Sequence, residues 1–372
     1  MHYYFAPLEG ITGYLYRNTH HAFFPGTDKY FMPFAAPNYT RNFKRKEKAD
    51  MAPANNTGIC VVPQILSNNA SETLWAIDQM LELGYREINL NLGCPMPTVA
   101  KKRKGSGFLK FMSDLDAYLD EVYNGIASRG CLLSVKTRLG TDTTSEAEGL
   151  ITIYNRYPIS ELIIHPRCQR DLYRGKPDRE AFLLALSMST NPVVYNGDLC
   201  TAEDVAAAQD LWGLRGLRDS VGAAEELRGL RDSVGAADSK ACSASDIRDE
   251  LRGDRSDGSG IDTVMIGRGL LANPALVRQC QGGPAITSAE LRDFHAALYA
   301  GYQKILPGTT VLLNHMKELW FYMGQLYIGQ KNLSSAGSSE AVKLLKQIRK
   351  ASTKAQYEAA VNILIGNCPM IG

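Results

Sequence analysis

The sequence lacks three features that would each assign it to a class at once. None of its eight cysteines belongs to a Cys-x-x-Cys pair. Structural zinc sites and small disulfide frameworks depend on closely spaced cysteines, so we expect no metal and a reducing, cytoplasmic environment. No apolar run reaches the roughly 20 residues of a membrane span, and the chain does not open on a basic region followed by an apolar stretch. We therefore expect no membrane partner and no signal peptide.

The sequence also lacks an excess of either positive or negative charge. The formal net charge of the chain is only +2, so the composition as a whole does not indicate a nucleic-acid partner, although a local basic patch would allow one. Hydrophobic residues make up 45% of the chain and charged residues 22%, which is ordinary for a globular protein. A length of 372 residues suits one barrel of about 250 residues together with a smaller domain.

Eight short apolar segments recur along the first three quarters of the chain, and helix-length segments separate most of them. This alternation predicts an α/β fold, a parallel TIM or (β/α)8 barrel. Residues 70–83 have helical spacing and stop at Gly84. The third strand contains Pro63, which suits the end of a strand better than its middle. The predicted strands span residues 3–6, 29–34, 59–66, 86–90, 132–136, 161–165, 192–196 and 262–267.

The fourth predicted strand runs into the stretch Asn-Leu-Asn-Leu-Gly-Cys-Pro, at residues 89–95. Gly93 and Pro95 stop the strand and leave Cys94 on a loop at its C-terminal end. An isolated free cysteine is often a small buried hydrophobe, but two asparagines and a Gly-Cys-Pro turn are poor material for a core. Because (β/α)8 barrels carry their reactive groups at this end of the strands, Cys94 is the main catalytic candidate.

Polar residues also follow the other strands. One His or Lys in such a place is usually satisfied by its neighbours, whereas six polar groups on one rim indicate an active site. Glycine-containing loops follow the last two strands, and such loops bind phosphate in many barrels. An arginine in the second loop would add a bidentate partner for the phosphate. The six rim residues are Gln64, Cys94, Lys136, His165, Asn196 and Arg268, and the loops are residues 196–198 and 267–269.

Residues 214–260 interrupt the barrel pattern between the last two strands. The segment 214–224 recurs identically as 227–237, and the following stretch is rich in Ser, Asp, Arg and Gly. Two copies are too few to stack as a solenoid, and a long surface loop costs little entropy. We therefore expect a low-complexity surface insertion that the chemistry does not need.

The pattern becomes all-helical in residues 284–372, so we expect a barrel domain at residues 1–283 and a small helical domain after it. A helix-start signal lies at Thr287 or Ser288. A later helix, predicted at residues 341–360, has one acid and a basic stripe. Such a stripe suits either a solvated face or a nucleic-acid backbone. Its basic residues are Lys343, Lys346, Arg349, Lys350 and Lys354.

Together these motifs resemble those of the tRNA-dihydrouridine synthases, in the order of that family and along the whole predicted barrel. The most specific are Asn-Leu-Gly-Cys-Pro around Cys94 and Ile-Gly-Arg-Gly around Arg268. The resemblance implies an FMN-bearing barrel that uses NADPH to reduce the C5–C6 double bond of specific uridines in tRNA. It also implies a helical RNA-binding region. Further matching stretches are residues 6–10, 135–138, 164–167, 173–176, 194–198 and 273–274.

The resemblance implies roles for single residues as well. Cys94 would protonate C5 of the uracil while the flavin delivers hydride to C6, and a thiol of pKa about 8.5 stays protonated at pH 7. Asn91 would face the uracil. We also expect Arg167 to contact the RNA, together with Lys346 and Lys350 of the basic stripe. The cofactor would lie on Pro7 and Leu8, with Gln64, Lys136 and His165 along its ring and ribityl chain, and with Asn196, Gly197, Asp198, Gly267 and Arg268 toward its phosphate.

Two other interpretations stay open from the sequence. An FMN barrel that acts on a small pyrimidine, like the dihydroorotate dehydrogenases, would also use a loop cysteine but would need no basic helical domain. An RNA-binding protein without catalysis would not need Cys94, Lys136 and His165. Cys168, just after His165, is the nearest rival proton donor. We expect the protein to act as a monomer.

Overall fold

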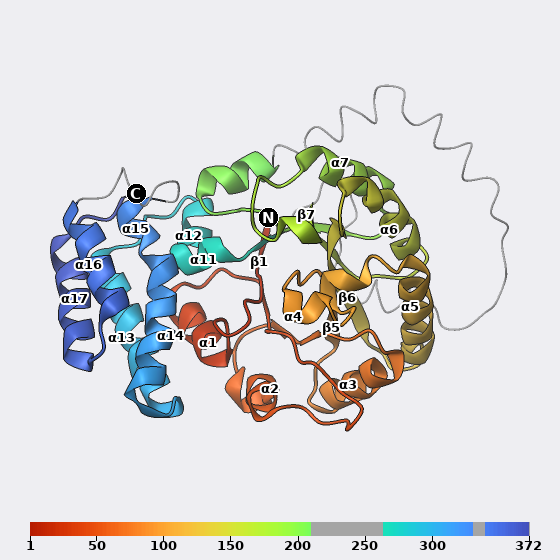
Figure 1. Ribbon diagram of the computed structural model, residues 1–372, viewed down its shortest axis with the longest axis horizontal. Coiled ribbons are helices and arrows are strands. Elements are labelled where there is room, and N and C mark those ends of the chain that lie inside the picture. The colour runs from red at the N-terminus through yellow and green to blue at the C-terminus, as the bar shows by residue number, and fades with distance from the viewer. Residues whose placement is uncertain (210–262, 330–338, 372) are drawn as a thin grey trace.

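The computed structural model describes residues 1–209, 263–329 and 339–371, and the predicted insertion at residues 214–260 lies outside them. The described strands are parallel and neighbour one another in the order β3-β2-β1-β9-β8-β7-β6-β5-β4. The two outermost strands, β3 (Val61–Val62) and β4 (Gln64–Ile65), are one stretch of chain interrupted at Pro63, which has no N–H to donate to a ladder. The sheet therefore closes on itself, and the predicted (β/α)8 barrel is confirmed (Figure 1).

The strands lie close to their predicted positions, but three run further at their C-terminal ends. The apolar pattern stops at residues 90, 136 and 165, whereas β5, β6 and β7 continue to Leu92, Gly140 and Cys168. The extra residues include Asn91, Arg138 and Arg167, whose buried polar side chains break the apolar run without ending the strand. The other strands are β1 (His2–Phe5), β2 (Lys29–Phe31), β8 (Val193–Tyr195) and β9 (Thr263–Ile266), with β5 (Glu87–Leu92), β6 (Leu132–Gly140) and β7 (Leu162–Cys168) between them.

Helices surround the barrel, as Figure 1 shows. The predicted helix at residues 70–83 is α3 (Ala70–Glu82), and the Asn69 side chain caps it by accepting a hydrogen bond from the Glu72 N–H at 2.9 Å. Further helices of the barrel part are α1 (Tyr14–Phe23), α2 (Arg45–Met51), α4 (Pro97–Ala100), α5 (Met112–Ile126), α6 (Ala147–Tyr154), α7 (Arg179–Met188), α11 (Arg268–Ala272) and α12 (Leu276–Cys280).

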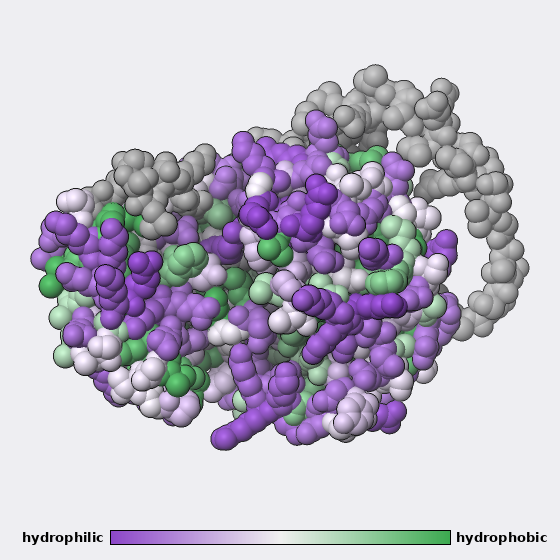
Figure 2. Space-filling view, in the orientation of Figure 1, coloured by the Kyte–Doolittle hydropathy of each residue, from purple (hydrophilic) through white to green (hydrophobic). Residues whose placement is uncertain are grey.

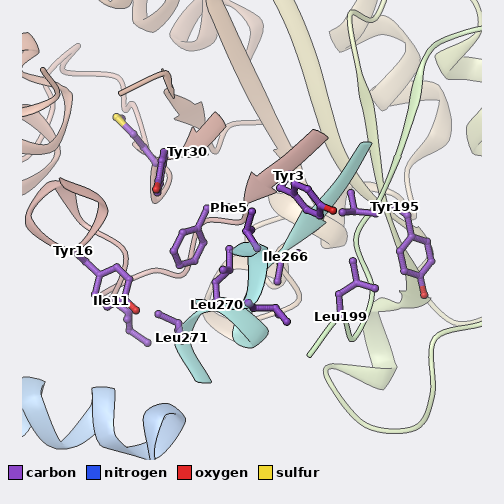
Figure 3. Close-up of a cluster of buried hydrophobic side chains, with 14 of the residues drawn as sticks. Tyr3, Phe5, Ile11, Tyr16, Tyr30, Tyr195, Leu199, Ile266, Leu270 and Leu271 are labelled. Carbon is purple, nitrogen blue, oxygen red and sulfur yellow. The ribbon is translucent and has the colours of Figure 1, made fainter. Parts of the chain in front are cut away.

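Side chains alternate between two cores because successive strand residues point to opposite faces. The outward residues join the layer between strands and helices, where Phe5 of β1, Ile266 of β9 and Leu270 of α11 lie together in Figure 3. The inward residues form a second cluster inside the barrel. That cluster consists of Tyr4, Ala6, Phe31, Val62, Ile163, Val194 and Met265.

A largely buried charged cluster closes the end of the barrel where the strands begin. The Lys29 ammonium donates to Glu87 at 2.8 Å and to Glu161 at 3.1 Å, and the Tyr4 hydroxyl donates to Glu161 at 2.6 Å. Burial raises the pKa of Glu87, although the Lys29 charge opposes the shift. One ammonium thus holds two carboxyl groups, far along the strands from the predicted active site.

We expect the substitution Lys29→Met to lower the free energy of unfolding by about 3–5 kcal/mol at pH 8, because it leaves two largely buried carboxylates without the counter-charge of Lys29. A raised carboxyl pKa favours the folded state at low pH and costs stability as the pH rises through it. The loss should therefore shrink at pH 5.5. Chemical denaturation at both pH values measures this, with the exposed Lys48→Met on α2 as the control. Equal losses at the two pH values would contradict the assignment.

The C-terminal helices form a group beside the barrel, in which α13 packs on α1 and α14 packs on α11 (Figure 1). Thr287 caps α13 as predicted, in a reciprocal capping box with Glu290. The prediction of a single helix at residues 341–360 is wrong, because the structure has two helices there. The chain breaks after Lys350, because the Thr353 side chain accepts a hydrogen bond from the Gln356 N–H and starts a new helix. The helices are α13 (Ser288–Ile305), α14 (Gly308–Met323), α15 (Gln325–Ile328), α16 (Ser339–Lys350) and α17 (Lys354–Asn367).

Within the described residues, no helix combines the length and the apolar character that crossing a membrane requires.

Candidate active site

The C-terminal ends of the barrel strands surround a cavity of about 700 Å³. The helical group completes its wall, because Glu318, Phe321 and Tyr322 of α14 also line it. Helical spacing places these three residues on one face, but only docking of α14 on α11 reveals that the face belongs to the site. Of the predicted site residues, the cavity is lined by Pro7, Leu8, Gln64, Asn91, Cys94, Lys136, His165, Asn196, Asp198, Gly267 and Arg268.

A chain of side-chain amides runs across β4, β5 and β6 beneath the cavity. Asn89 donates to Ser134 at 2.8 Å and accepts from Gln64 at the same distance, and Gln64 in turn accepts from Asn91 at 2.8 Å. The Asn91 carbonyl oxygen then accepts the backbone N–H groups of Gly93, at 3.1 Å, and Cys94, at 2.9 Å. Asn91 therefore fixes the turn that carries Cys94, in addition to lining the cavity.

Residues Gly105 and Ser106 also hold the Cys94 loop in place. Both the N–H and the hydroxyl of Ser106 donate to the Cys94 carbonyl, at 3.1 and 3.0 Å. Gly105 has φ +57°, and a Cβ there would lie only 2.7 Å from the Cys94 carbonyl oxygen, so this approach requires glycine. Burial raises the pKa of the half-buried Cys94 thiol more than its neighbours lower it, which keeps the thiol protonated at neutral pH.

The other cysteines near the site differ in access. Cys168 is 2% exposed and does not line the cavity, so its position does not suit the predicted role of rival proton donor. Cys200, which follows β8, does line the wall. Both cysteines come a few positions after a predicted strand, so the sequence alone does not distinguish the buried cysteine from the one in the cavity wall.

Lys136 brings a positive charge to the cavity floor. Burial, followed by repulsion from Arg138, lowers the pKa of its ammonium to about 7. Among the described residues, its Nζ has no acidic partner within 4 Å and no hydrogen-bond partner. Arg138, in contrast, is fully engaged with backbone carbonyls of Gly93, Cys168 and Leu172 at 2.7–3.0 Å. Lys136, unlike Arg138, is thus available to an anion in the cavity.

His165 is neutral and its tautomer follows from its partner. Burial, with the charges of Arg138 and Lys136, lowers the pKa of His165 well below its usual value. Arg167 donates from Nη1 to the His165 Nε2 at 2.9 Å. Because an arginine has no acceptor, Nε2 carries no proton and the ring presents Nδ1–H as its donor.

Arg167 itself lies behind the cavity wall. It is 1% exposed, does not line the cavity and donates to His165, to Asp198 and to the backbone of residues 174 and 175. The sequence placed Arg167 at the RNA, but its hydrogen bonds are used inside the protein. It holds His165 and Asp198 in place.

Asp198 joins the two glycine loops. Its carboxylate accepts from Arg167 and, at 2.6 Å, from Arg268, and its backbone is left-handed at φ +38°. Burial raises the pKa of Asp198, but the hydrogen bonds and charges of Arg167 and Arg268 outweigh it and the pKa is lowered. A carboxylate repels a phosphate, so only the backbone of Asp198 suits that ligand. Gly197 lies behind the wall, and a Cβ there would come within 2.9 Å of the Tyr195 hydroxyl oxygen.

Arg268 remains accessible at the start of α11. Its side chain is 38% exposed, and its guanidinium lies 5.1 Å from the centre of the Tyr173 ring. Lys346 and Lys350, by contrast, lie exposed on α16 and do not line the cavity.

The matching family model is that of the dihydrouridine synthases (Dus), over residues 4–224, and the chain belongs to this family. It is 26% identical over 199 residues to "tRNA-dihydrouridine synthase B" of Vibrio parahaemolyticus, an alignment that covers 53% of this chain and 60% of the relative. It is 28% identical over 228 residues to "Probable tRNA-dihydrouridine synthase" of Staphylococcus aureus, covering 61% and 55%. The aligned part thus spans little more than half of each relative.

Among solved structures, morphinone reductase in complex with tetrahydroNAD aligns over 76% of this chain and 87% of its own, with a TM-score of 0.43 and 10% sequence identity.

Proposed function

We propose that this protein is a tRNA-dihydrouridine synthase, which uses bound FMN and NADPH to reduce the C5–C6 double bond of uridines in tRNA. The observation that carries the proposal is one cavity that holds a protonated thiol, Cys94, and a partly buried lysine, Lys136, that has no acidic partner among the described residues. Membership of the dihydrouridine synthase family supports it. The proposal also places the protein in the cytoplasm as a monomer.

The cavity residues fit an anionic cofactor. A volume of about 700 Å³ lies within the range of cofactor sites. Pro7 and Leu8 offer apolar contacts, and Gln64, Lys136 and the Nδ1–H of His165 offer polar ones. Arg268 is the accessible cation for the phosphate, together with the backbone of residues 196–198 and 267–269. When bound, FMN would supply the hydride, and the protein would orient it and provide a proton.

The residues of the chain divide the remaining work. Cys94 holds the proton that C5 of the uracil needs, and Asn91 fixes the turn from which the thiol acts. Lys136 stabilises negative charge on the cofactor side of the cavity. A uridine inside folded tRNA is stacked, so it must be drawn out to reach this depth.

The mouth of the cavity favours a polymer over a small pyrimidine. Phe321 of α14 is 71% exposed although it lines the wall, and it meets the Tyr322 ring edge-to-face at 5.2 Å. An exposed aromatic ring at the mouth suits stacking on a base next to the extruded uridine. We also propose that the helical region, with Lys346 and Lys350 on α16, contacts the RNA.

A direct test follows the oxidation of NADPH by the purified flavoprotein with and without tRNA that lacks dihydrouridine. The proposal expects sustained oxidation only when tRNA is present. A small pyrimidine that sustains oxidation without tRNA would support the dihydroorotate dehydrogenase-like alternative instead. Replacing NADPH with NADH in the same assay would establish the preferred reductant.

We expect Arg268→Ala to weaken FMN retention, because a charge-assisted phosphate contact contributes about 1.5–3 kcal/mol, or about 10- to 150-fold in Kd. Flavin fluorescence during titration of the apoprotein measures the change. Arg278→Ala is the matched control, since Arg278 pairs with Glu290 on the surface at 2.6 Å. Unchanged FMN affinity in Arg268→Ala would remove Arg268 from the phosphate site.

A further inference from the structure

A second, smaller hollow lies beside the Cys94 loop. It has a volume of about 320 Å³ and shares no lining residue with the main cavity. Its walls come from the loop that follows α4 and from the segments that follow β6 and β7. Four cations line it, against the single acid Asp142. They are Lys101, Arg103, Lys110 and Arg170.

The cations of this basic hollow are poorly compensated. Among the described residues, Lys101, Arg103 and Lys110 have no acidic partner within 4 Å, and Arg170 reaches Asp171 only at 4.0 Å. All four side chains are exposed, and the surface between α4 and β6 is largely hydrophilic in Figure 2. Bringing like charges together costs free energy, which a bound anion would recover.

One of the cations is held in place. Arg103 has a left-handed backbone, φ +52°, which is uncommon for a residue other than glycine. Its guanidinium lies over the Phe111 ring, 4.1 Å from the centre. A guanidinium anchored on a ring loses less freedom when it binds a phosphate, so this residue is prepared for such a ligand.

Tight packing connects the hollow to the Cys94 loop. Gly107, which lines it, packs so closely on Ala100 that a Cβ would lie 2.4 Å from the Ala100 carbonyl oxygen. The adjacent Ser106 holds the Cys94 carbonyl with two hydrogen bonds. A group bound in the hollow would therefore be fixed relative to Cys94.

We propose that the basic hollow binds a backbone phosphate of the RNA and so sets the position of the strand relative to Cys94. The inference rests on the proposed function. The ligand chemistry is a phosphate ester, which NADPH also carries. The RNA is favoured because the hollow opens on the surface, separate from the main cavity, and its cations continue along an exposed basic run, residues 101–103.

The test removes Arg103 and Lys110 together by substitution to alanine in the flavin-loaded full chain. Two lost phosphate contacts should weaken tRNA binding by tenfold or more at about 0.1 M salt and flatten the dependence of log Kd on log salt by about 2. FMN content and flavin reduction by NADPH should stay at the wild-type level. The control removes two cations at the other end of the barrel, Arg86→Ala with Arg129→Ala, and should leave the salt dependence unchanged.

Two results would overturn the inference. An unchanged tRNA affinity and salt slope would show that the hollow does not meet the RNA. An unchanged tRNA affinity with a raised KM for NADPH would assign the phosphate to the nucleotide instead. If the double variant does not fold, Lys101→Ala with Lys110→Ala tests the same prediction and leaves the Arg103–Phe111 contact intact. Failure of wild-type protein to bind tRNA would instead contradict the proposed function.

Discussion

Replacing Cys94 with alanine should slow the transfer of reducing equivalents to tRNA by about 10²–10⁴-fold, which is the usual contribution of a positioned general acid. FMN content and flavin reduction by NADPH should remain nearly normal. The reason is local: Cys94 presents a protonated thiol to the cavity, and the amide of Asn91 and the hydroxyl of Ser106 fix its loop. Rapid mixing of the NADPH-treated protein with tRNA, followed by recovery of flavin absorbance, measures the step.

Two further cysteines provide matched controls. Cys200→Ala removes another thiol from the cavity wall, and Cys168→Ala removes a buried one. Both should retain most of the rate. A rate near that of the wild type in Cys94→Ala, or a larger loss in Cys200→Ala, would transfer the role of acid to another group.

Replacing Lys136 with methionine should have the second largest effect, a fall of about 10²–10³-fold in the rate of flavin reduction by NADPH. Removing one preorganised electrostatic partner of a reacting centre has a cost of this size. Lys136 has no counter-ion among the described residues, so its charge is available to a ligand bound in the cavity. Stopped-flow absorbance measures the rate, and Lys136→Arg, which keeps the charge, should recover part of it.

Because the pKa of Lys136 is lowered to about 7, we also expect the affinity for FMN to depend on pH. The ammonium form predominates below about pH 7, and it attracts an anionic cofactor. The affinity of the apoprotein for FMN should therefore weaken as the pH rises through about 7. This dependence should be absent in Lys136→Met. An identical pH profile in the two proteins would show that another group is responsible.

The barrel was predictable because its strands are short apolar runs separated by helices, and polar residues follow those runs at one end. The same rule misjudged where β5, β6 and β7 end. Asn91, Arg138 and Arg167 are buried, and their hydrogen bonds make polar side chains acceptable there. A pattern of hydrophobicity cannot distinguish such residues from the start of a loop.

The parts of the site that depend on tertiary contacts were not predictable. Phe321 looks like an ordinary helical aromatic until α14 docks beside the barrel mouth. Arg167 is adjacent to the site in sequence but faces Asp198, which comes from the next strand's loop. Arg170 and Lys110 meet in the basic hollow only because the loop after α4 lies against the segments that follow β6 and β7. Propensity also failed at Thr353, whose capping role interrupts a continuous helical pattern.

The most direct measurement of the central claim is mass spectrometry of tRNA that lacks dihydrouridine, after incubation with the flavin-loaded protein and NADPH. The account predicts a gain of two hydrogen atoms at specific uridines with the wild-type protein, and almost none with Cys94→Ala under the same conditions. Oxidation of NADPH by the wild-type protein without any change in the mass of the tRNA nucleosides would contradict it.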